Sequence, residues 1–248
     1  MRSPYLKQQG STKVLMVDDH PFVMLAGELH NSNSSTPEAM EASCRKAVEL
    51  GMNSVIATLS WELIEPEEGC FDFSTVDMVI DIARKHGLKL ELIWFGSWKN
   101  AQCAYAPAWV KKDLNRFPRA EMQKGKRSGR MEILGAVNYT TLSYLSEEAC
   151  KADARAFHAV MAHIREIESR ENTVLMMQVE NETGVLTAAR EHSDLADRLF
   201  YGPAPAELVQ YPKAHTENMA DEVRAAVEEG ADAGTWEECF CSVAEELF

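Results

Sequence analysis

The sequence lacks the patterns that hold a metal ion, a nucleotide or a membrane. Its six cysteines include no CxxC pair, and no histidine lies at zinc-finger spacing, so we expect reduced thiols and no metal site. Neither a GxGxxG nor a GxxxxGKS/T loop occurs, and no cofactor is predicted. No run approaches the roughly 20 apolar residues of a membrane span. Residues 1–10 lack the apolar core of a signal peptide, which favours a cytoplasmic protein, or an extracellular or periplasmic one if the N-terminus is trimmed.

Basic residues are also scarce. The 248 residues hold 25 Lys and Arg against 39 Asp and Glu, a net charge of −14. Phosphate groups are bound by basic surfaces, so nucleic acid and anionic membranes are excluded as the main partners. Hydrophobic residues make up 46%, which is typical of a folded globular chain and excludes a disordered one.

Apolar strand patterns alternate with helical ones along most of the chain. Runs at 22–27, 54–59, 88–94 and 173–179 read as strands, and the last is apolar enough to be buried on both faces. The helices between them have recognisable start signals, which are Thr36 as N-cap before Pro37, Ser74 with Asp77 as a capping box, and Ser146 as N-cap. Gly51 and Gly87 are the predicted helix ends. The alternation predicts an α/β fold with a parallel sheet. Since no phosphate loop follows the first strand, a (β/α) barrel is favoured over a nucleotide-binding sheet.

The chain divides into three predicted parts. Residues 1–20 form a lead-in hairpin, and residues 21–184 hold four βα units. Residues 185–248 form a loop and an acidic helical region, because residues 217–248 contain ten acids and a single base. We expect a helix around residues 221–229 with the acids on its solvated face.

Carboxylate, amide and tryptophan side chains gather just after the predicted strands. In a parallel barrel these strand ends open onto one face, so the side chains would converge there. Carboxylates with tryptophans suit carbohydrate, since sugars offer hydroxyl groups to the polar residues and apolar C–H faces to Trp. Glu182 closes an apolar strand, where desolvation would raise its pKa and make it a proton donor. The predicted substrate-binding residues are Glu28, His30, Trp61, Glu62, Trp98, Asn100 and Asn181.

Four segments resemble β-galactosidases. Residues 178–184, QVENETG, are similar to the QVENEYG segment of glycoside hydrolase family 35. Residues 27–30 resemble its SGEIHY, residues 61–73 its PWNLHEPxxGxxdF, and residues 96–102 its GPYINAE. Families 42 and 5 of the same superfamily also have an Asn-Glu pair at the end of strand four.

The resemblance implies a retaining (β/α)8 TIM-barrel glycosidase of β-galactosidase type acting on an oligosaccharide or other glycoside. It assigns the general acid/base to Glu182, and it expects the nucleophile, a Glu after strand seven, beyond residue 248. Only 66 residues follow Glu182 (248 − 182), whereas four more βα units of about 30 residues would need about 120. The chain is therefore predicted to be the N-terminal half of a barrel. Departures at Leu59, Glu62, Gln102 and Thr183 indicate a divergent branch.

Other interpretations stay open. The chain is alternatively an inactive fragment with at most carbohydrate binding, or part of a family 5-like β-glycanase. A half-barrel would leave sheet edges unpaired, which predicts self-association. His158 and His163 are expected to pack on a helix, and the basic residues between 111 and 130 to pair with nearby carboxylates.

Overall fold

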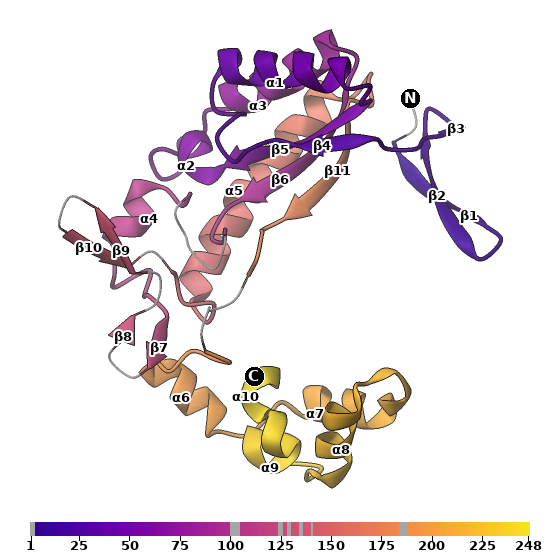
Figure 1. Ribbon diagram of the computed structural model, residues 1–248. Coiled ribbons are helices and arrows are strands. Elements are labelled where there is room, and N and C mark those ends of the chain that lie inside the picture. The colour runs from indigo at the N-terminus through magenta and orange to yellow at the C-terminus, as the bar shows by residue number, and fades with distance from the viewer. Residues whose placement is uncertain are drawn as a thin grey trace. The chain divides into compact units, whose positions relative to one another are not determined.

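The computed structural model describes residues 3–99, 105–123, 126–127, 130–133, 136–139, 141–183 and 188–248 (Figure 1). The chain forms two compact units. One, the sheet unit, comprises residues 1–117 and 147–183, and the other, the helical unit, comprises residues 118–146 and 184–248.

The sheet unit is built on four parallel strands in the order β11-β6-β5-β4, which confirms the predicted α/β class with a parallel sheet. The strands are β4 (Ala26–Glu28), β5 (Ser54–Ser60), β6 (Lys89–Phe95) and β11 (Val174–Val179). Leu59 lies beside Trp94, and Trp94 beside Val179, so three of the strands end at the same level. Within the described residues the sheet does not close into a barrel.

The first strand is shorter than predicted. Residues 22–25 lie outside β4 because other groups take their backbone hydrogen bonds. Phe22 N donates to Leu15 O at 2.8 Å. The Asn53 side chain then accepts from Leu25 N and donates to Val23 O, both at 2.8 Å. Most of the apolar run at 22–27 is therefore a loop whose backbone is hydrogen-bonded to Leu15 and Asn53.

The helix that follows β4 begins where its sequence predicts. Helix α1 (Pro37–Glu49) has Thr36 as its N-cap, and Thr36 Oγ1 accepts from Ala39 N at 3.3 Å. The predicted stop glycines also have the left-handed backbone expected of them, with φ of 77° at Gly51 and 68° at Gly87.

The predicted capping box of the next helix is wrong. Helix α3 (Ser74–Lys85) has Ser74 as its first residue rather than its cap, and its N-cap, Phe73, makes no side-chain cap bond. Asp72 supplies the acceptor instead, with Ser74 N donating to Asp72 Oδ1 at 2.9 Å. Asp72, two residues before Ser74, therefore provides the side-chain acceptor at the start of this helix.

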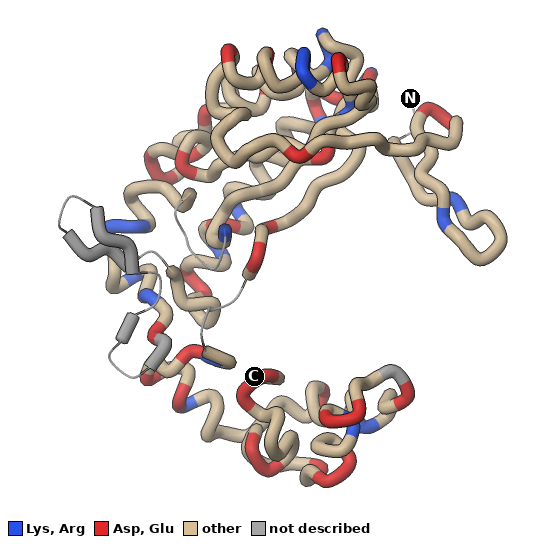
Figure 2. The backbone as a smooth tube through the Cα atoms, viewed as in Figure 1, with Lys and Arg blue, Asp and Glu red and all other residues tan. Residues whose placement is uncertain are grey.

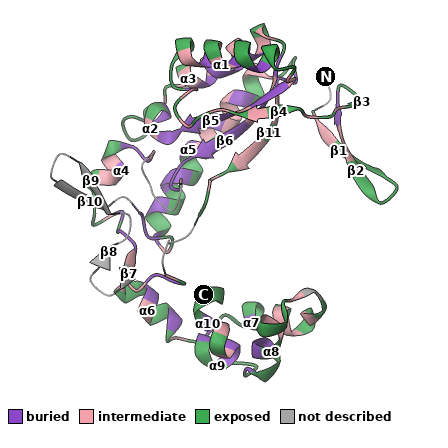
Figure 3. Ribbon diagram, viewed as in Figure 1, coloured by how far each residue is buried: buried purple, intermediate pink, exposed green. Residues whose placement is uncertain are grey.

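The core lies between the sheet and helices α1, α3 and α5 (Glu147–Ile167) (Figure 3). Its fully buried side chains include Val55, Ala57, Leu59, Leu90, Leu92, Trp94, Met40, Val79 and Ile80. Strand β11 is less covered than its apolar sequence predicts, because Met176 is 40% and Val179 58% exposed. It is an end strand of the sheet, so its apolar composition does not correspond to burial on both faces.

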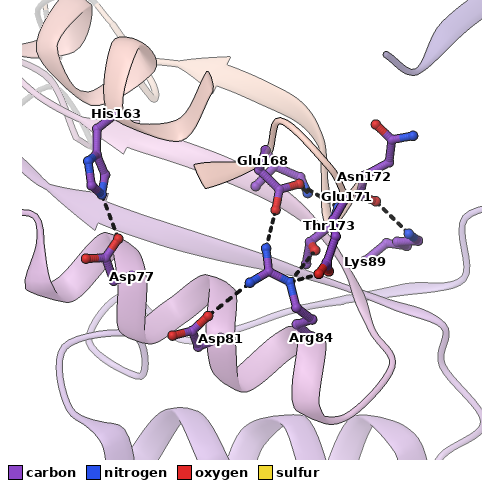
Figure 4. A network of polar contacts seen from close by, with 10 residues as sticks. Asp77, Asp81, Arg84, Lys89, His163, Glu168, Glu171, Asn172 and Thr173 are labelled. Carbon is purple, nitrogen blue, oxygen red and sulfur yellow. Dashed lines mark hydrogen bonds and ion pairs between the residues drawn. The ribbon is translucent and has the colours of Figure 1, made fainter. Parts of the chain in front are cut away.

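The amino end of the sheet is held by a polar network around Arg84 (Figure 4). Arg84 Nη2 donates to Glu168 Oε1 at 2.6 Å, and Glu171 and Asp81 also contact the guanidinium. The other oxygen of Glu168 accepts from the backbone of Thr173 at 2.6 Å, just before β11 begins. Nearby, His163 pairs with Asp77 at 2.6 Å, so this histidine packs against α3. The contacts of Arg84 and Glu168 lie at the amino end of the strands, away from the predicted site.

A hairpin precedes the sheet. Strand β1 (Tyr5–Gln9) pairs antiparallel with β2 (Thr12–Val17), and β2 pairs with β3 (His20–Pro21). The two residues between β2 and β3, Asp18 and Asp19, both have positive φ, as a tight two-residue hairpin turn requires.

The helical unit has its own core. Trp236 and Phe240 on α9 (Trp236–Phe240) pack with Phe200, Val209 and Val227. A half-barrel would leave Trp236 and Phe240 without core partners, and this expectation is wrong because both pack inside the helical unit. The helices of this unit are α6 (Asp194–Phe200), α7 (Ala206–Ala214), α8 (Asp221–Glu229), α9 and α10 (Ala244–Leu247), with 3-10 turns η1 (Thr216–Asn218) and η2 (Cys241–Val243).

The acidic residues of α8 lie on its outside. They are exposed while Ala226 and Val227 are buried, and Figure 2 shows where acids occur along the helices of this unit. The predicted solvated acidic face is confirmed at α8.

The remaining elements are α2 (Trp61–Ile64), α4 (Ala108–Lys112), β7 (Glu121–Gln123), β8 (Lys126–Arg127), β9 (Arg130–Ile133) and β10 (Ala136–Tyr139). No helix in the described part of the chain is both long and apolar enough for a membrane span.

Candidate active site

The carboxyl end of β11 has an unusual backbone. Glu180 and Glu182 both have left-handed φ, 63° and 51°, with Asn181 between them. Non-glycine residues rarely adopt this conformation, and where they do, the surrounding contacts hold them. Here Gln178 Nε2 donates to Glu180 O and to Asn181 Oδ1, both at 2.9 Å. The strand end is therefore a fixed turn that presents the Asn-Glu pair.

The Glu180 side chain binds the loop that follows β6. Trp98 N donates to Glu180 Oε2 at 2.7 Å, and Ser97 N donates to Glu180 Oε1 at 3.1 Å. Ser97 N also donates to Asp153 Oδ2 at 2.6 Å, and Trp94 Nε1 donates to Asp153 Oδ1 at 2.7 Å. Asp153 comes from α5, and its Oδ2 shares the N–H of Ser97 with Glu180 Oε1. Two carboxyl groups thus connect the ends of β6 and β11 with α5.

Burial controls the chemistry of Glu180. Desolvation, with the adjacent Asp153 carboxyl adding to it, raises the pKa of Glu180 to about 9, although the Trp98 and Ser97 amides act in the opposite direction. Glu180 therefore holds its proton at neutral pH, because the charged form would lie in a poorly hydrated place next to a second carboxylate.

Glu182, the predicted acid/base, lies in a different environment. Its side chain is 64% exposed, and its Oε2 is 3.9 Å from Lys99 Nζ. Asn181 Nδ2 donates to the same oxygen at 3.2 Å. The expectation that Glu182 occupies the dry position at the strand end is wrong. In a regular strand Glu180 and Glu182, two positions apart, would face the same side. The left-handed φ at both residues breaks this pattern, and the Glu180 side chain binds the loop after β6 while that of Glu182 is exposed.

The end of β5 brings a correction for Trp61. Its side chain is fully buried, Nε1 donates to Glu65 Oε2 at 2.7 Å, and the ring packs edge-on against Trp109. No face of the ring is open to a sugar, so Trp61 has a packing role. Glu62 is partly exposed, and its Oε2 pairs with Lys111 Nζ at 3.1 Å.

The predicted residues at the end of β4 lie lower along the sheet than those at the ends of β5, β6 and β11. Glu28 is exposed and lies beside Ile56, three residues before Leu59, which places it roughly 10 Å below the level where β5 and β6 end. The chain then rises beside β5, since Asn31 O accepts from Thr58 Oγ1 at 2.8 Å. His30, between Glu28 and Asn31 in the sequence, is exposed.

Of the two predicted sugar contacts after β6, Trp98 lies within the described residues and Asn100 does not. Trp98 is buried to 8% exposure while its backbone binds Glu180. Asn100 and Gln102 lie outside the described residues. The predicted pairing of basic residues is seen at Arg116, whose guanidinium contacts Glu68 at 2.8 Å and Glu148 at 3.4 Å.

Sequence reasoning missed Asp153 and Lys99. A signal for Asp153 was present, because it lies on the apolar face of α5 with Ala149, Ala152, Ala156 and Val160. A charged residue on such a face needs a buried partner. Lys99 carried no such signal, since lysines after strands are common. Among the described residues no three His, Cys, Asp or Glu side chains come together as potential metal ligands.

The chain is similar to known β-galactosidases. The family model described as β-galactosidase, glycoside hydrolase family 42, matches residues 30–220. The β-galactosidases BgaB of Geobacillus sp. strain Y412MC61 and bgaB of Geobacillus kaustophilus are each 40% identical over 70 residues, or 27% of this chain. These matches span only 9% of each relative's length. Of the β-galactosidase families that the sequence resembles, the match is to family 42. Because the family match covers most of the chain and includes every strand of the sheet except β4, the chain belongs to the family 42 β-galactosidases.

Proposed function

We propose that this chain contributes the acid/base side of a retaining β-galactosidase, with Glu182 as the catalytic acid and base. One observation carries the proposal: the Asn181–Glu182 pair stands at the carboxyl end of a parallel strand, held in a left-handed turn with the Glu182 carboxyl open to solvent. Membership of a β-galactosidase family supports the galactoside as substrate class. Glu28, His30, Glu62, Trp98 and Asn100 are the proposed sugar-contacting residues on the neighbouring strand ends.

The proposed reaction has two steps. In the first, a nucleophilic carboxylate attacks the anomeric carbon while the Glu182 carboxyl gives its proton to the leaving oxygen. In the second, the Glu182 carboxylate takes a proton from water, whose oxygen attacks the same carbon and releases the nucleophile. Retaining enzymes place the two carboxyl groups about 5–5.5 Å apart. The proposed nucleophile is a Glu outside these 248 residues, at another strand end of a (β/α)8 barrel.

Substituting Glu182 by Gln in the complete gene product tests the acid/base role. Activity on an alkyl β-galactoside should fall by about 10³-fold, because the leaving alkoxide needs a proton. Activity on 2,4-dinitrophenyl β-galactoside should fall far less, because that leaving group departs without one. The matched control is Glu166→Gln, which removes one exposed carboxylate from α5 and should leave both activities unchanged. An equal loss on both substrates would overturn the assignment.

An assay of the 248-residue chain tests where the nucleophile lies. Under the proposal the isolated chain binds galactosides at most and does not turn them over, because a single acid cannot fill both roles. Turnover by a monomeric chain would contradict this, and it would direct attention to Glu28 and Glu62 as the second carboxylate.

A further inference from the structure

A pair of carboxyl groups, Asp153 buried and Glu180 half-buried, lies next to the proposed acid/base and takes no part in the proposed chemistry. Asp153 and Glu180 accept hydrogen bonds from Trp94 Nε1, Ser97 N and Trp98 N, all within 3.1 Å. One of these donors, Ser97 N, serves both Asp153 Oδ2 and Glu180 Oε1, which places the two carboxyl groups side by side. The cation nearby, Lys99, pairs with Glu182.

The close approach of the two carboxyl groups favours a proton on one of them. An ionised carboxylate has acceptors only, so two carboxyl groups that share one N–H donor can bind each other only when one of them is protonated. Two adjacent carboxylates out of water would also repel each other. The three N–H donors match a pair that carries a single negative charge, since they add partial positive charge without adding a cation.

The pair is connected to the proposed acid/base through a continuous set of hydrogen bonds. Glu180 O accepts from Gln178 Nε2, which also donates to Asn181 Oδ1. Asn181 Nδ2 then donates to Glu182 Oε2. The Glu180 side chain meanwhile binds the backbone of Trp98. Glu180 is therefore the point at which the turn carrying Glu182 is joined to the loop after β6.

We propose that Asp153 and Glu180 share one proton and act as a positioning pair that holds the Asn181–Glu182 turn against the loop of Ser97 and Trp98. The pair itself rests on these contacts, and it depends on the proposed function only in that Glu182 is the group being positioned. The proton stays on the pair at neutral pH, because burial together with Asp153 raises the pKa of Glu180. Above that pKa the hydrogen bond between the carboxyl groups is replaced by repulsion, and the turn is released.

The indole N–H of Trp94 provides a reporter that needs no catalysis. It donates to Asp153 at 2.7 Å and is fully buried, so its NMR signal in protein with 15N-labelled tryptophan senses the charge on the pair. Trp94→Phe assigns the signal. We expect the wild-type signal to move in a single alkaline transition, well above the ordinary range of a carboxyl group.

Two variants should change this transition in different ways. Glu180→Gln replaces the protonated carboxyl by an amide that still donates to Asp153, so the signal should keep its position and lose the transition. Asp153→Asn removes the neighbouring charge, so the transition should move toward lower pH. Glu182→Gln is the matched control, and it should leave the transition in place because it alters the acid/base and not the pair.

The outcomes separate this proposal from the proposed function. A wild-type signal without an alkaline transition, or a transition that survives in Glu180→Gln, overturns the positioning pair. If Glu180→Gln does not fold, the wild-type titration and the direction of the Asp153→Asn shift decide. Failure of the acid/base assignment would appear in the Glu182→Gln assays, while the Trp94 titration would be unchanged.

Discussion

Trp61 and Glu65 form a fully buried pair one helical turn apart, in which the indole Nε1 donates to Glu65 Oε2 at 2.7 Å. The other oxygen, Oε1, accepts from Gly69 N at 2.7 Å. The carboxylate thereby joins α2 to the turn that leads into α3. Within the segment that resembles a glycosidase motif, Trp61, Glu65 and Gly69 thus bind one another and have a structural role.

Replacing Glu65 by Ala should destabilise the protein strongly. The change leaves the buried N–H of Trp61 without its acceptor, which costs about 1–3 kcal/mol, and it also removes the acceptor of Gly69 N at a more exposed position. We expect the free energy of unfolding to fall by about 3 kcal/mol in urea titrations. Glu67→Ala, at an exposed position two residues away, should cost under about 0.5 kcal/mol. Equal effects would contradict the role of Glu65.

The network at the amino end of the sheet predicts a graded series. Glu168→Ala removes the acceptor for the Thr173 and Val174 amides as well as for Arg84, and it should cost about 2–3 kcal/mol. Asp81→Ala removes an exposed partner of the same arginine and should cost less than about 1 kcal/mol. Urea unfolding of both variants measures the difference, and a larger cost at Asp81 would refute this ranking.

Gly96 lies where a methyl group would displace the carboxyl pair. A Cβ at this position would lie 2.5 Å from both Asp153 oxygens and 2.3 Å from Trp94 Nε1. Gly96→Ala should therefore cost about 2 kcal/mol or more, as overpacking does, and it should shift the Trp94 indole signal. Gly51→Ala meets open space, and its strain comes from φ alone. It should cost about 1 kcal/mol and leave the indole signal unchanged.

Local signals in the sequence predicted those parts of the fold that local contacts determine. Thr36, Pro37 and Gly51 bound α1 as expected, because capping depends on neighbouring residues alone. The exposure of Met176 and the internal core around Trp236 were not predictable in this way. Both depend on which segments pack together, and an apolar run is compatible with either outcome.

The candidate site was predictable in its position but not in its geometry. The Asn181–Glu182 turn does stand at a strand end facing the loop after β6. The two glutamates differ in burial because the left-handed φ at Glu180 and Glu182 interrupts the alternation by which a regular strand would place both on one face. The pairing of Glu180 with Asp153 also joins residues 27 positions apart through tertiary packing.

The protonated state of Glu180 predicts a pH dependence of stability. In the unfolded chain Glu180 loses its proton near its ordinary pKa of 4.5, whereas in the folded chain it keeps the proton until about pH 9. Unfolding therefore releases a proton between these values. The stability that Glu180 contributes is fully present below pH 4.5 and is lost as the pH rises through 9.

Glu180→Gln should remove this dependence. The free energy of unfolding of the variant, relative to wild type, should rise steadily from about pH 5 to pH 9 and then level off. Acidic residues with lowered pKa values, such as Glu68 beside Arg116, act in both proteins and cancel in the difference. A difference that stays constant across this range in urea titrations would count against a protonated Glu180.

The outer edge of β11 predicts self-association of the chain. In the described part of the chain β11 pairs on one side only, with β6. Its Met176 and Val179 are exposed, and Met176 lines a groove together with Met161 and Met177. An apolar, unpaired edge is a template for pairing with a second strand. Sedimentation velocity over a hundredfold range of concentration should show dimers or larger species. Val179→Lys places a charge on this edge and should shift the chain to monomer, whereas Leu6→Lys, an equally exposed change on the hairpin, should not. A wild-type chain that stays monomeric throughout would show that this edge is protected in solution.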